Sequence, residues 1–178
     1  MDTKGQLTYM SIEEEILDRV DRGMLFSLLP KAAGDAPIRA MFVGERLWGV
    51  LESAEGDADW ERRVGELRAD LEVFVTQRDI DPKYLFLLFP ALEAVWEIRS
   101  TGSDPSLRVL GLFAMKDVFV AADCALRSDL GGWQSRAWKA IKRNAKAIWR
   151  SLFHPYDPIL TTNVNDVVTG AIDGKYFK

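Results

Sequence analysis

Apolar and polar positions recur with different periods along this 178-residue chain, and each period predicts a different element. Ser11 and Glu14 have the spacing of a helix-capping box, which predicts a short helix over residues 11–22. Apolar residues at intervals of three and four predict a second helix, over residues 59–77, and this stripe is interpreted as core: Trp60, Val64, Leu67, Leu71 and Phe74. The segment 38–52 fits neither period cleanly, and helix is the favoured interpretation.

The middle of the chain has the pattern of a small sheet. VWEIRS at 95–100 alternates between the two faces of a strand, and TGSDPS at 101–106 has the composition of a turn. LRVLGLFAMKDVFVAA at 107–122 contains two further strands, about 107–113 and 118–122, joined by a hairpin at 115–117. These segments predict an antiparallel three-stranded meander. LFLLF at 85–89 is continuously apolar and too short to assign.

A long amphipathic helix follows Gly131-Gly132 and runs to about Phe153, where Pro155 prevents its continuation. Beyond it, a short helix is expected at 163–170, and the tail then lies loose or docks on the sheet. The predicted fold class is therefore α+β: N-terminal helices, a small antiparallel meander and a long basic C-terminal helix packed across it. The expected organisation is one compact domain, with an N-terminal helical extension (1–55), a core (56–155) and a C-terminal tail (156–178).

Composition narrows the class of protein. Apolar residues at 48% and charged residues at 28% are typical of a globular domain. The single cysteine excludes an internal disulfide framework, and no motif for a metal or cofactor occurs, so none is predicted. No apolar run approaches the ~20 residues of a membrane span, and the expected location is cytoplasmic.

Charge is distributed unevenly along the chain. Residues 1–90 contain 11 Lys and Arg against 18 Asp and Glu, whereas residues 91–178 contain 12 against 9. No acidic residue lies between Asp129 and Asp157, and five cations fall within about 80° of arc on the C-terminal helix: Arg136, Lys139, Arg143, Lys146 and Arg150. Two interpretations stay open, namely contact with nucleic-acid phosphates, or a solvated face balanced by acids from the first ninety residues. A helix lying on a membrane surface fits less well.

Four other cations are candidates for phosphate chemistry: Arg99, Arg108, Lys116 and Arg127. If Arg99 and Arg108 share one face of the sheet, they could hold a phosphate bidentately and offset the charge that develops in phosphodiester cleavage. The alternative is that Arg99 pairs with Glu97 or with an N-terminal acid. The lone His154 and the lone Cys124 are interpreted as structural.

The order of these pieces resembles the RelE/HigB-type toxin superfamily of toxin–antitoxin systems, including its phage-derived members. The resemblance covers about residues 60–150 and is carried by three strand motifs, WEIR at 96–99, LRVL at 107–110 and VFVA at 118–121. It implies metal-independent cleavage of mRNA, generally on the ribosome, by cationic and aromatic side chains. By position, it makes Arg99, Arg108, Lys116 and Arg127 the candidate phosphate or catalytic cations.

Two classes of function remain open at this point. The first is an RNA-directed protein of RelE-like architecture, either an endoribonuclease or a relative that has lost catalysis. The alternative is a non-catalytic protein–protein interaction module of phage or mobile-element origin, whose partner is another protein or a second copy of the chain. The expected partners are accordingly RNA or the ribosome in the first case and a protein in the second, with no membrane in either.

Overall fold

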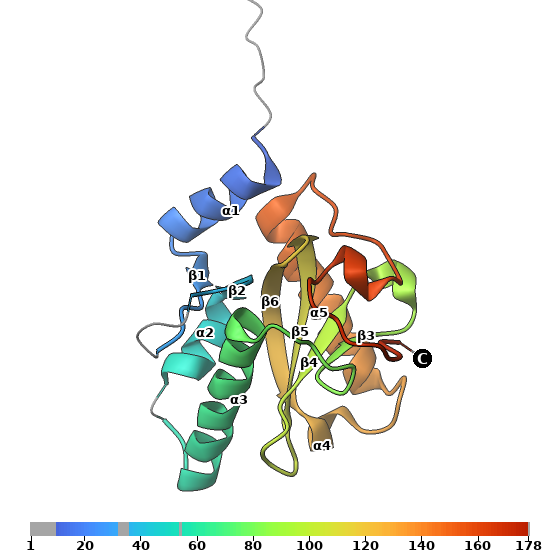
Figure 1. The fold of residues 1–178 in the computed structure, drawn as a ribbon. Helices are drawn as coiled ribbons and strands as arrows, with labels where there is room; N and C mark the ends of the chain where they lie inside the picture. The colour runs from blue at the N-terminus through green and yellow to red at the C-terminus, as the bar shows by residue number, and fades with distance from the viewer. Residues whose placement is uncertain (1–9, 32–35, 54, 178) are drawn as a thin grey trace, which may run out of the picture.

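One six-stranded sheet runs through the computed structural model, which describes residues 10–31, 36–53 and 55–177 (Figure 1). The strand order is β1-β2-β6-β5-β4-β3; β2 and β6 are parallel, and all other neighbouring strands are antiparallel. The strands are β1 (Leu25–Ser27), β2 (Ala40–Gly44), β3 (Leu85–Leu87), β4 (Trp96–Arg99), β5 (Leu107–Met115) and β6 (Val118–Leu126). The predicted meander is confirmed as β4, β5 and β6, within a larger mixed sheet.

The helices are α1 (Ile12–Asp21), α2 (Glu45–Glu52), α3 (Ala58–Thr76), α4 (Arg127–Leu130) and α5 (Arg136–Phe153), with short 3₁₀ turns η1 (Ala91–Glu93) and η2 (Val164–Asp166). The predicted first, second and long C-terminal helices are confirmed as α1, α3 and α5. Both bonds of the capping box are present, because the Glu14 N–H donates to Ser11 Oγ (3.2 Å) and the Ser11 N–H donates to the Glu14 carboxylate (2.7 Å).

Two predictions of secondary structure are wrong. Residues 40–44 of the segment expected to be helical form β2, and only Glu45–Glu52 is helix. β2 pairs with β6, more than seventy residues later in sequence, and this long-range pairing overrides the weak local pattern. The helix expected at 163–170 is a single 3₁₀ turn, since the next residues dock on the sheet: Val167 accepts a backbone hydrogen bond from Asp117 (2.8 Å).

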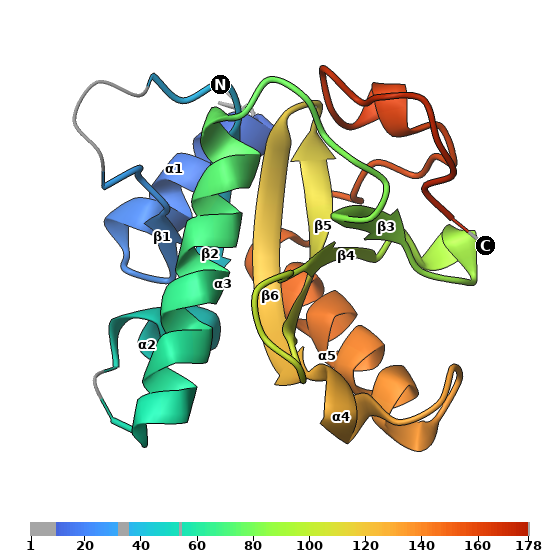
Figure 2. The same ribbon diagram turned by 60° about the horizontal axis from the view of Figure 1, so that its bottom comes forward.

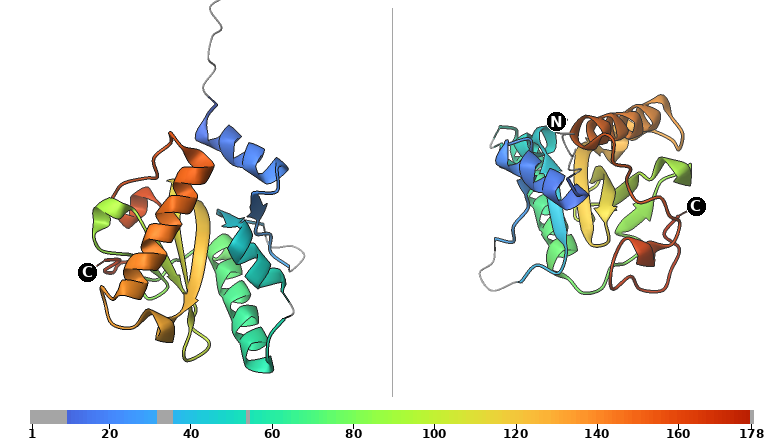
Figure 3. Two further views of the ribbon diagram at one scale, coloured as in Figure 1. Left: turned by 180° about the vertical axis from the view of Figure 1, so that it is seen from behind. Right: turned by 90° about the horizontal axis from the view of Figure 1, so that it is seen from above.

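Helices cover both faces of the sheet, and each face has its own hydrophobic core (Figure 2). α2, α3 and the C-terminal segment pack on one face, and the apolar stripe of α3 lies in that core, as predicted. α1 and α5 cover the other face, where Trp138, Ile141 and Trp149 of α5 are buried. Seen from behind, α5 lies across β5 and β6 (Figure 3).

All three predicted segments of the chain contribute to these cores, through Met41, Trp96 and Tyr176 for example. The C-terminal segment is held by Arg39, a 2%-exposed cation whose Nε lies 3.3 Å from the Asp117 carboxylate. Burial lowers the pKa of Arg39, and Asp117 opposes this shift. Its guanidinium donates to carbonyl oxygens of four residues: Phe74, Gln77, Arg78 and Thr169.

Candidate functional site

Arg99 and Arg108 lie directly opposite each other on β4 and β5, so their side chains leave the same face of the sheet. Between them lies Glu97, which is 2% exposed. Arg99 Nε donates to one oxygen of this carboxylate (3.0 Å), and Arg108 Nε lies 3.4 Å from the other. The two arginines therefore share a face, and the pairing of Arg99 with Glu97 also occurs.

Arg127 joins this pair from the start of α4. Its guanidinium donates to the Gly131 carbonyl (2.7 Å), and no acidic side chain pairs with it among the residues that the structure describes. Burial is the main cause that lowers the pKa of Arg108; Glu97 opposes it, and the charges of Arg99 and Arg127 lower it further. Two arginines thus pair with one carboxylate and Arg127 lies close enough to act on Arg108, which leaves the site with a net positive charge.

Lys116 is not part of this arrangement. It lies in the tight turn between β5 and β6, whereas Arg108 lies at the opposite end of β5. The intervening strand spans roughly 25 Å at the usual rise per residue. The structure therefore brings together three of the four predicted phosphate-binding cations and leaves Lys116 at the far end of the sheet.

Aromatic rings connect the outer two arginines. The Arg99 guanidinium lies 4.3 Å from the ring centre of Phe86, and the Arg127 guanidinium lies 5.9 Å from that of Trp138. Trp133 bridges the two rings, because it contacts Phe86 (6.5 Å between centroids) and stacks on Trp138 (5.3 Å, 6° between planes). We call this set the cation–aromatic cluster: Phe86, Glu97, Arg99, Arg108, Arg127, Trp133 and Trp138.

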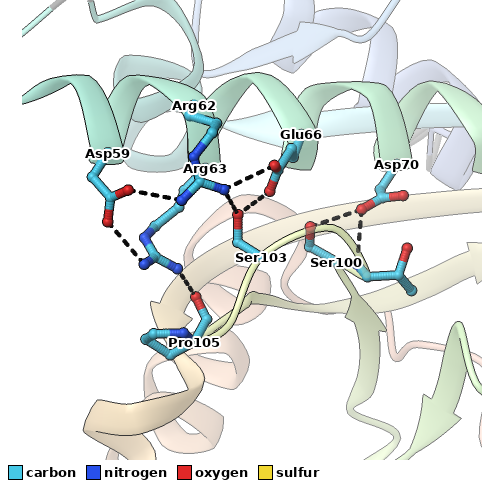
Figure 4. A network of polar contacts seen from close by, with 9 residues as sticks. Asp59, Arg62, Arg63, Glu66, Asp70, Ser100, Ser103 and Pro105 are labelled. Carbon is cyan, nitrogen blue, oxygen red and sulfur yellow. Dashed lines mark hydrogen bonds and ion pairs between the residues drawn. The ribbon is translucent and has the colours of Figure 1, made fainter.

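The loop that joins Arg99 to Arg108 is anchored to α3 on the other side of the sheet (Figure 4). Ser100 Oγ and the Thr101 N–H both donate to the Asp70 carboxylate (2.7 and 3.0 Å). Further along, Ser103 bonds to Glu66 and accepts from Arg62 (2.5 Å). These bonds hold the loop against α3, while the strand register places Arg99 opposite Arg108. They also engage acids of α3 far from the basic helix.

The outer face of α5 begins beside the cluster. Ser135 caps the helix by accepting from the Trp138 N–H (3.1 Å), and Arg136 is the first helical residue. Lys146 and its neighbour Lys142 both pair with Glu93 of η1, at 2.8 and 2.9 Å. Burial acts to raise the pKa of Glu93, but hydrogen bonds from Lys146 and Lys142 lower it below its usual range.

Most of the basic row has no acidic partner. Of the five predicted phosphate-binding cations on α5, four make no ion pair within the described part of the chain: Arg136, Lys139, Arg143 and Arg150. Among the described residues, the ion-pair partner of the α5 cations is Glu93 of η1, not an acid of the acid-rich first ninety residues. A surface groove of about 500 Å³ runs along this row, lined by Arg136, Lys139, Arg143 and Lys146 together with Glu93.

The remaining candidates contribute little reactive chemistry. Burial, and secondarily Asp123, raise the pKa of Cys124 to about 12, so the thiolate form is scarce at neutral pH. His154 ends α5, and its backbone N–H donates to Arg150. Among the described residues there is no cluster of three or more His, Cys, Asp or Glu side chains placed to hold a metal ion. None of the helices in that part of the chain is long and apolar enough to cross a membrane.

Comparison with known proteins adds no relative, since no family model, curated protein or solved structure matches this chain.

Several residues of the site were not identified from the sequence. Phe86 lies in a continuously apolar run that gives no indication of which side chains face a site. Trp133 was detectable as a large apolar residue between glycines and a polar turn, where a buried role is not expected. The role of Glu97 followed from its place two residues before Arg99 on one strand face, but only as an alternative.

Proposed function

We propose that this protein binds RNA, with the cation–aromatic cluster and the outer row of α5 contacting phosphates. The observation that carries the proposal is the pairing of Arg99 and Arg108 with the single carboxylate of Glu97, with the charge of Arg127 close enough to act on Arg108. Guanidinium groups match the geometry of phosphate oxygens, and a net positive cluster at a partly exposed position attracts a polyanion.

The charge of α5 extends this surface. The row from Arg136 to Arg150 continues away from the cluster on the same side of the sheet, and most of its members form no ion pair with any residue that the structure describes. The acids of α3 are on the opposite face, where they bind arginines of their own helix and the β4–β5 loop. On the α5 face itself, the acidic first turn of α1 (Glu13, Glu14 and Glu15) lies apart from this row in sequence, so the attractive charge is that of α5 and the cluster. The affinity for a polyanion should therefore depend strongly on salt.

Cleavage of the bound RNA is the sharper form of the proposal, in keeping with the RelE/HigB resemblance. In such a reaction the 2′-oxygen attacks the adjacent phosphorus, the bond to the 5′-oxygen breaks, and guanidiniums offset the charge that builds on the phosphate. A base must also accept the 2′-hydroxyl proton. Both oxygens of the buried Glu97 face guanidiniums, so this carboxylate serves to position the cations.

Arg127→Ala is the most direct test, because removing Arg127 leaves no carboxylate without its partner. We expect this variant to bind labelled mRNA more weakly at low salt. The slope of the logarithm of the binding constant against the logarithm of the salt concentration should also become shallower. The change should be ~0.7 for each phosphate of a single strand that the variant no longer neutralises. Lys116→Ala is the matched control, since it removes one charge at the far end of the sheet. It should bind as the parent protein does.

The same RNA is then incubated with and without ribosomes, in the presence of EDTA. Cleavage that persists in EDTA and disappears in Arg99→Ala, Arg108→Ala and Arg127→Ala would establish the nuclease. Binding without cleavage would leave an RNA-binding protein that lacks the activity. Absence of binding at low salt, or equal losses in Lys116→Ala and Arg127→Ala, would refute the proposed site.

A protein-interaction module is the second candidate, and one observation favours it. Exposed apolar side chains gather around η1 and the C-terminal segment, where Phe89 and Phe177 line one cavity and Leu92 and Leu160 line the next. Leu92 is 81% exposed. The α3 stripe, by contrast, is buried from Val64 to Phe74, and Trp60 at its start is partly buried against the same core. If a second copy docks at η1, the molar mass should rise with concentration, and Leu92→Asp should abolish the rise.

A further inference from the structure

We infer that a cavity beside the cation–aromatic cluster accepts one unpaired base of the bound RNA, an inference that rests on the RNA-binding function proposed above. The cavity has a volume of about 210 Å³ and is lined by Phe86, Phe89, Trp133, Gln134, Trp138 and Lys142. Sites for drug-sized ligands usually measure about 300–1,000 Å³. This cavity is smaller, so it suits a single planar ring system better than a whole nucleotide or cofactor.

The walls of the cavity provide ring faces at its entrance. Trp133 is 45% exposed and Phe89 is 61% exposed, although both are large apolar side chains. Every nucleobase has a π-face, and stacking on aromatic side chains is the usual way in which proteins hold unpaired bases. Below them, Trp138 is 2% exposed, and its buried Nε1–H has no hydrogen-bond acceptor among the described residues.

The backbone around Trp133 is held in an unusual conformation. Gly131 and Gln134 both have positive φ (64° and 65°), and the second of these is uncommon for a residue with a side chain. Ser135 anchors the end of this loop, because its hydroxyl donates to the Leu130 carbonyl (2.5 Å). The loop thus keeps the Trp133 ring over Trp138, and places the Gln134 amide in the cavity wall, where it can hydrogen-bond to a base edge.

Cations flank the cavity on both sides. Arg99 lies over Phe86, Arg127 lies over Trp138, and Lys142 lines the cavity itself. A base stacked on the exposed side of Trp133 would place the phosphates on either side of it near guanidinium groups. Since a base within a duplex is stacked and paired on both sides, the arrangement favours single-stranded RNA over a duplex.

The test compares three RNA probes of equal length by fluorescence anisotropy at one salt concentration: a single-stranded hexamer, the same hexamer with all bases removed, and a duplex. The parent protein should bind the single strand more tightly than the abasic backbone, by roughly 5- to 150-fold if one base stacks. Trp133→Ala should lose this difference, whereas Trp133→Tyr should retain most of it. Leu29→Ala removes an exposed apolar side chain outside the cavity and should change nothing, and thermal unfolding confirms that each variant folds.

The outcomes separate the two proposals. Two outcomes would overturn the base-binding cavity and leave the RNA-binding function intact. In the first, the protein binds the base-containing and the abasic strand equally well. In the second, Trp133→Ala still prefers the base-containing strand. Failure of every probe to bind would refute both. A preference for the duplex would also exclude the cavity as a base site.

Discussion

Replacing Glu97 with glutamine should lower the free energy of unfolding by about 3 kcal/mol. The substitution keeps the shape of the side chain and one carbonyl oxygen, but it removes the negative charge between Arg99 and Arg108. Those two guanidiniums then face each other across β4 and β5 with no counter-charge. The loss therefore reports how far the carboxylate holds the cluster together.

The magnitude follows from the geometry. Each ion pair is worth ~4 kcal/mol at about 4 Å and an effective dielectric constant of ~20, before the cost of burying the carboxylate is subtracted. Removing one member of a buried pair typically costs ~3–5 kcal/mol. The side chains of Arg99 and Arg108 retain 23% and 17% exposure, so they can turn toward water, and we expect the lower end of that range.

Urea denaturation at neutral pH, at low and high salt, provides the measurement. High salt should restore part of the loss, because it screens the repulsion between the guanidiniums. The double variant Glu97→Gln/Arg108→Leu should lose less stability than the sum of the single variants, since the second change removes one of the orphaned charges. A loss below about 1 kcal/mol in Glu97→Gln would refute the assignment of Glu97 as the group that positions the cations.

Three further predictions concern the surroundings of the site. Glu93→Gln frees Lys142 and Lys146, so it should strengthen RNA binding. The slope of the logarithm of the binding constant against the logarithm of the salt concentration should steepen by ~0.7 for each additional phosphate neutralised. Glu61→Gln on α3 is the control and should have neither effect, whereas weaker binding by Glu93→Gln would contradict this role for η1. Because the pKa of Glu93 is lowered on folding, its stabilising contribution is present at neutral pH and is lost as the pH falls through the folded-state value, so parent and Glu93→Gln should converge in acid. Cys124, with its pKa raised from 9.0 to about 12, should react with a disulfide reagent at pH 8 at least roughly 30-fold more slowly in the folded protein than in urea, because a smaller thiolate fraction outweighs its higher nucleophilicity. Equal rates would contradict its burial. Its raised pKa also means that folding stability should decline as the pH rises above about 9, where the unfolded thiol ionises. Gly111→Ala should destabilise the protein by at least ~1–3 kcal/mol, because a Cβ there would lie 2.2 Å from the Val120 carbonyl oxygen. Gly65→Ala, whose Cβ would have no neighbouring atom within 4 Å, should instead gain up to ~1 kcal/mol of helix stability. The free energies of unfolding of the two variants test both expectations.

Local signals predicted the parts of the site that depend on one strand or one helix. Alternation along WEIR places Glu97 and Arg99 on one face, and the spacing of α5 places its cations on one side. The partners were not predictable in the same way. Glu93 reaches Lys142 and Lys146 across about fifty residues, and Arg127 approaches Trp138 only because α4 turns the chain after β6.

The fold shows the same division. Periodicity and capping residues by themselves determined α1, α3, α5 and the β4–β6 meander, since each follows from contacts within a short stretch of chain. Only the tertiary structure decided that residues 40–44 form a strand and that β3 joins the sheet. Both segments are short and apolar, a pattern common to buried strands and helices, and pairing with β6 and β4 supplies the missing hydrogen bonds. Tertiary packing likewise separated Lys116 from Arg108, and it brought together the rings of Phe86, Trp133 and Trp138. The reason is that the distance between two side chains depends on strand register and on helix docking, which no local pattern encodes.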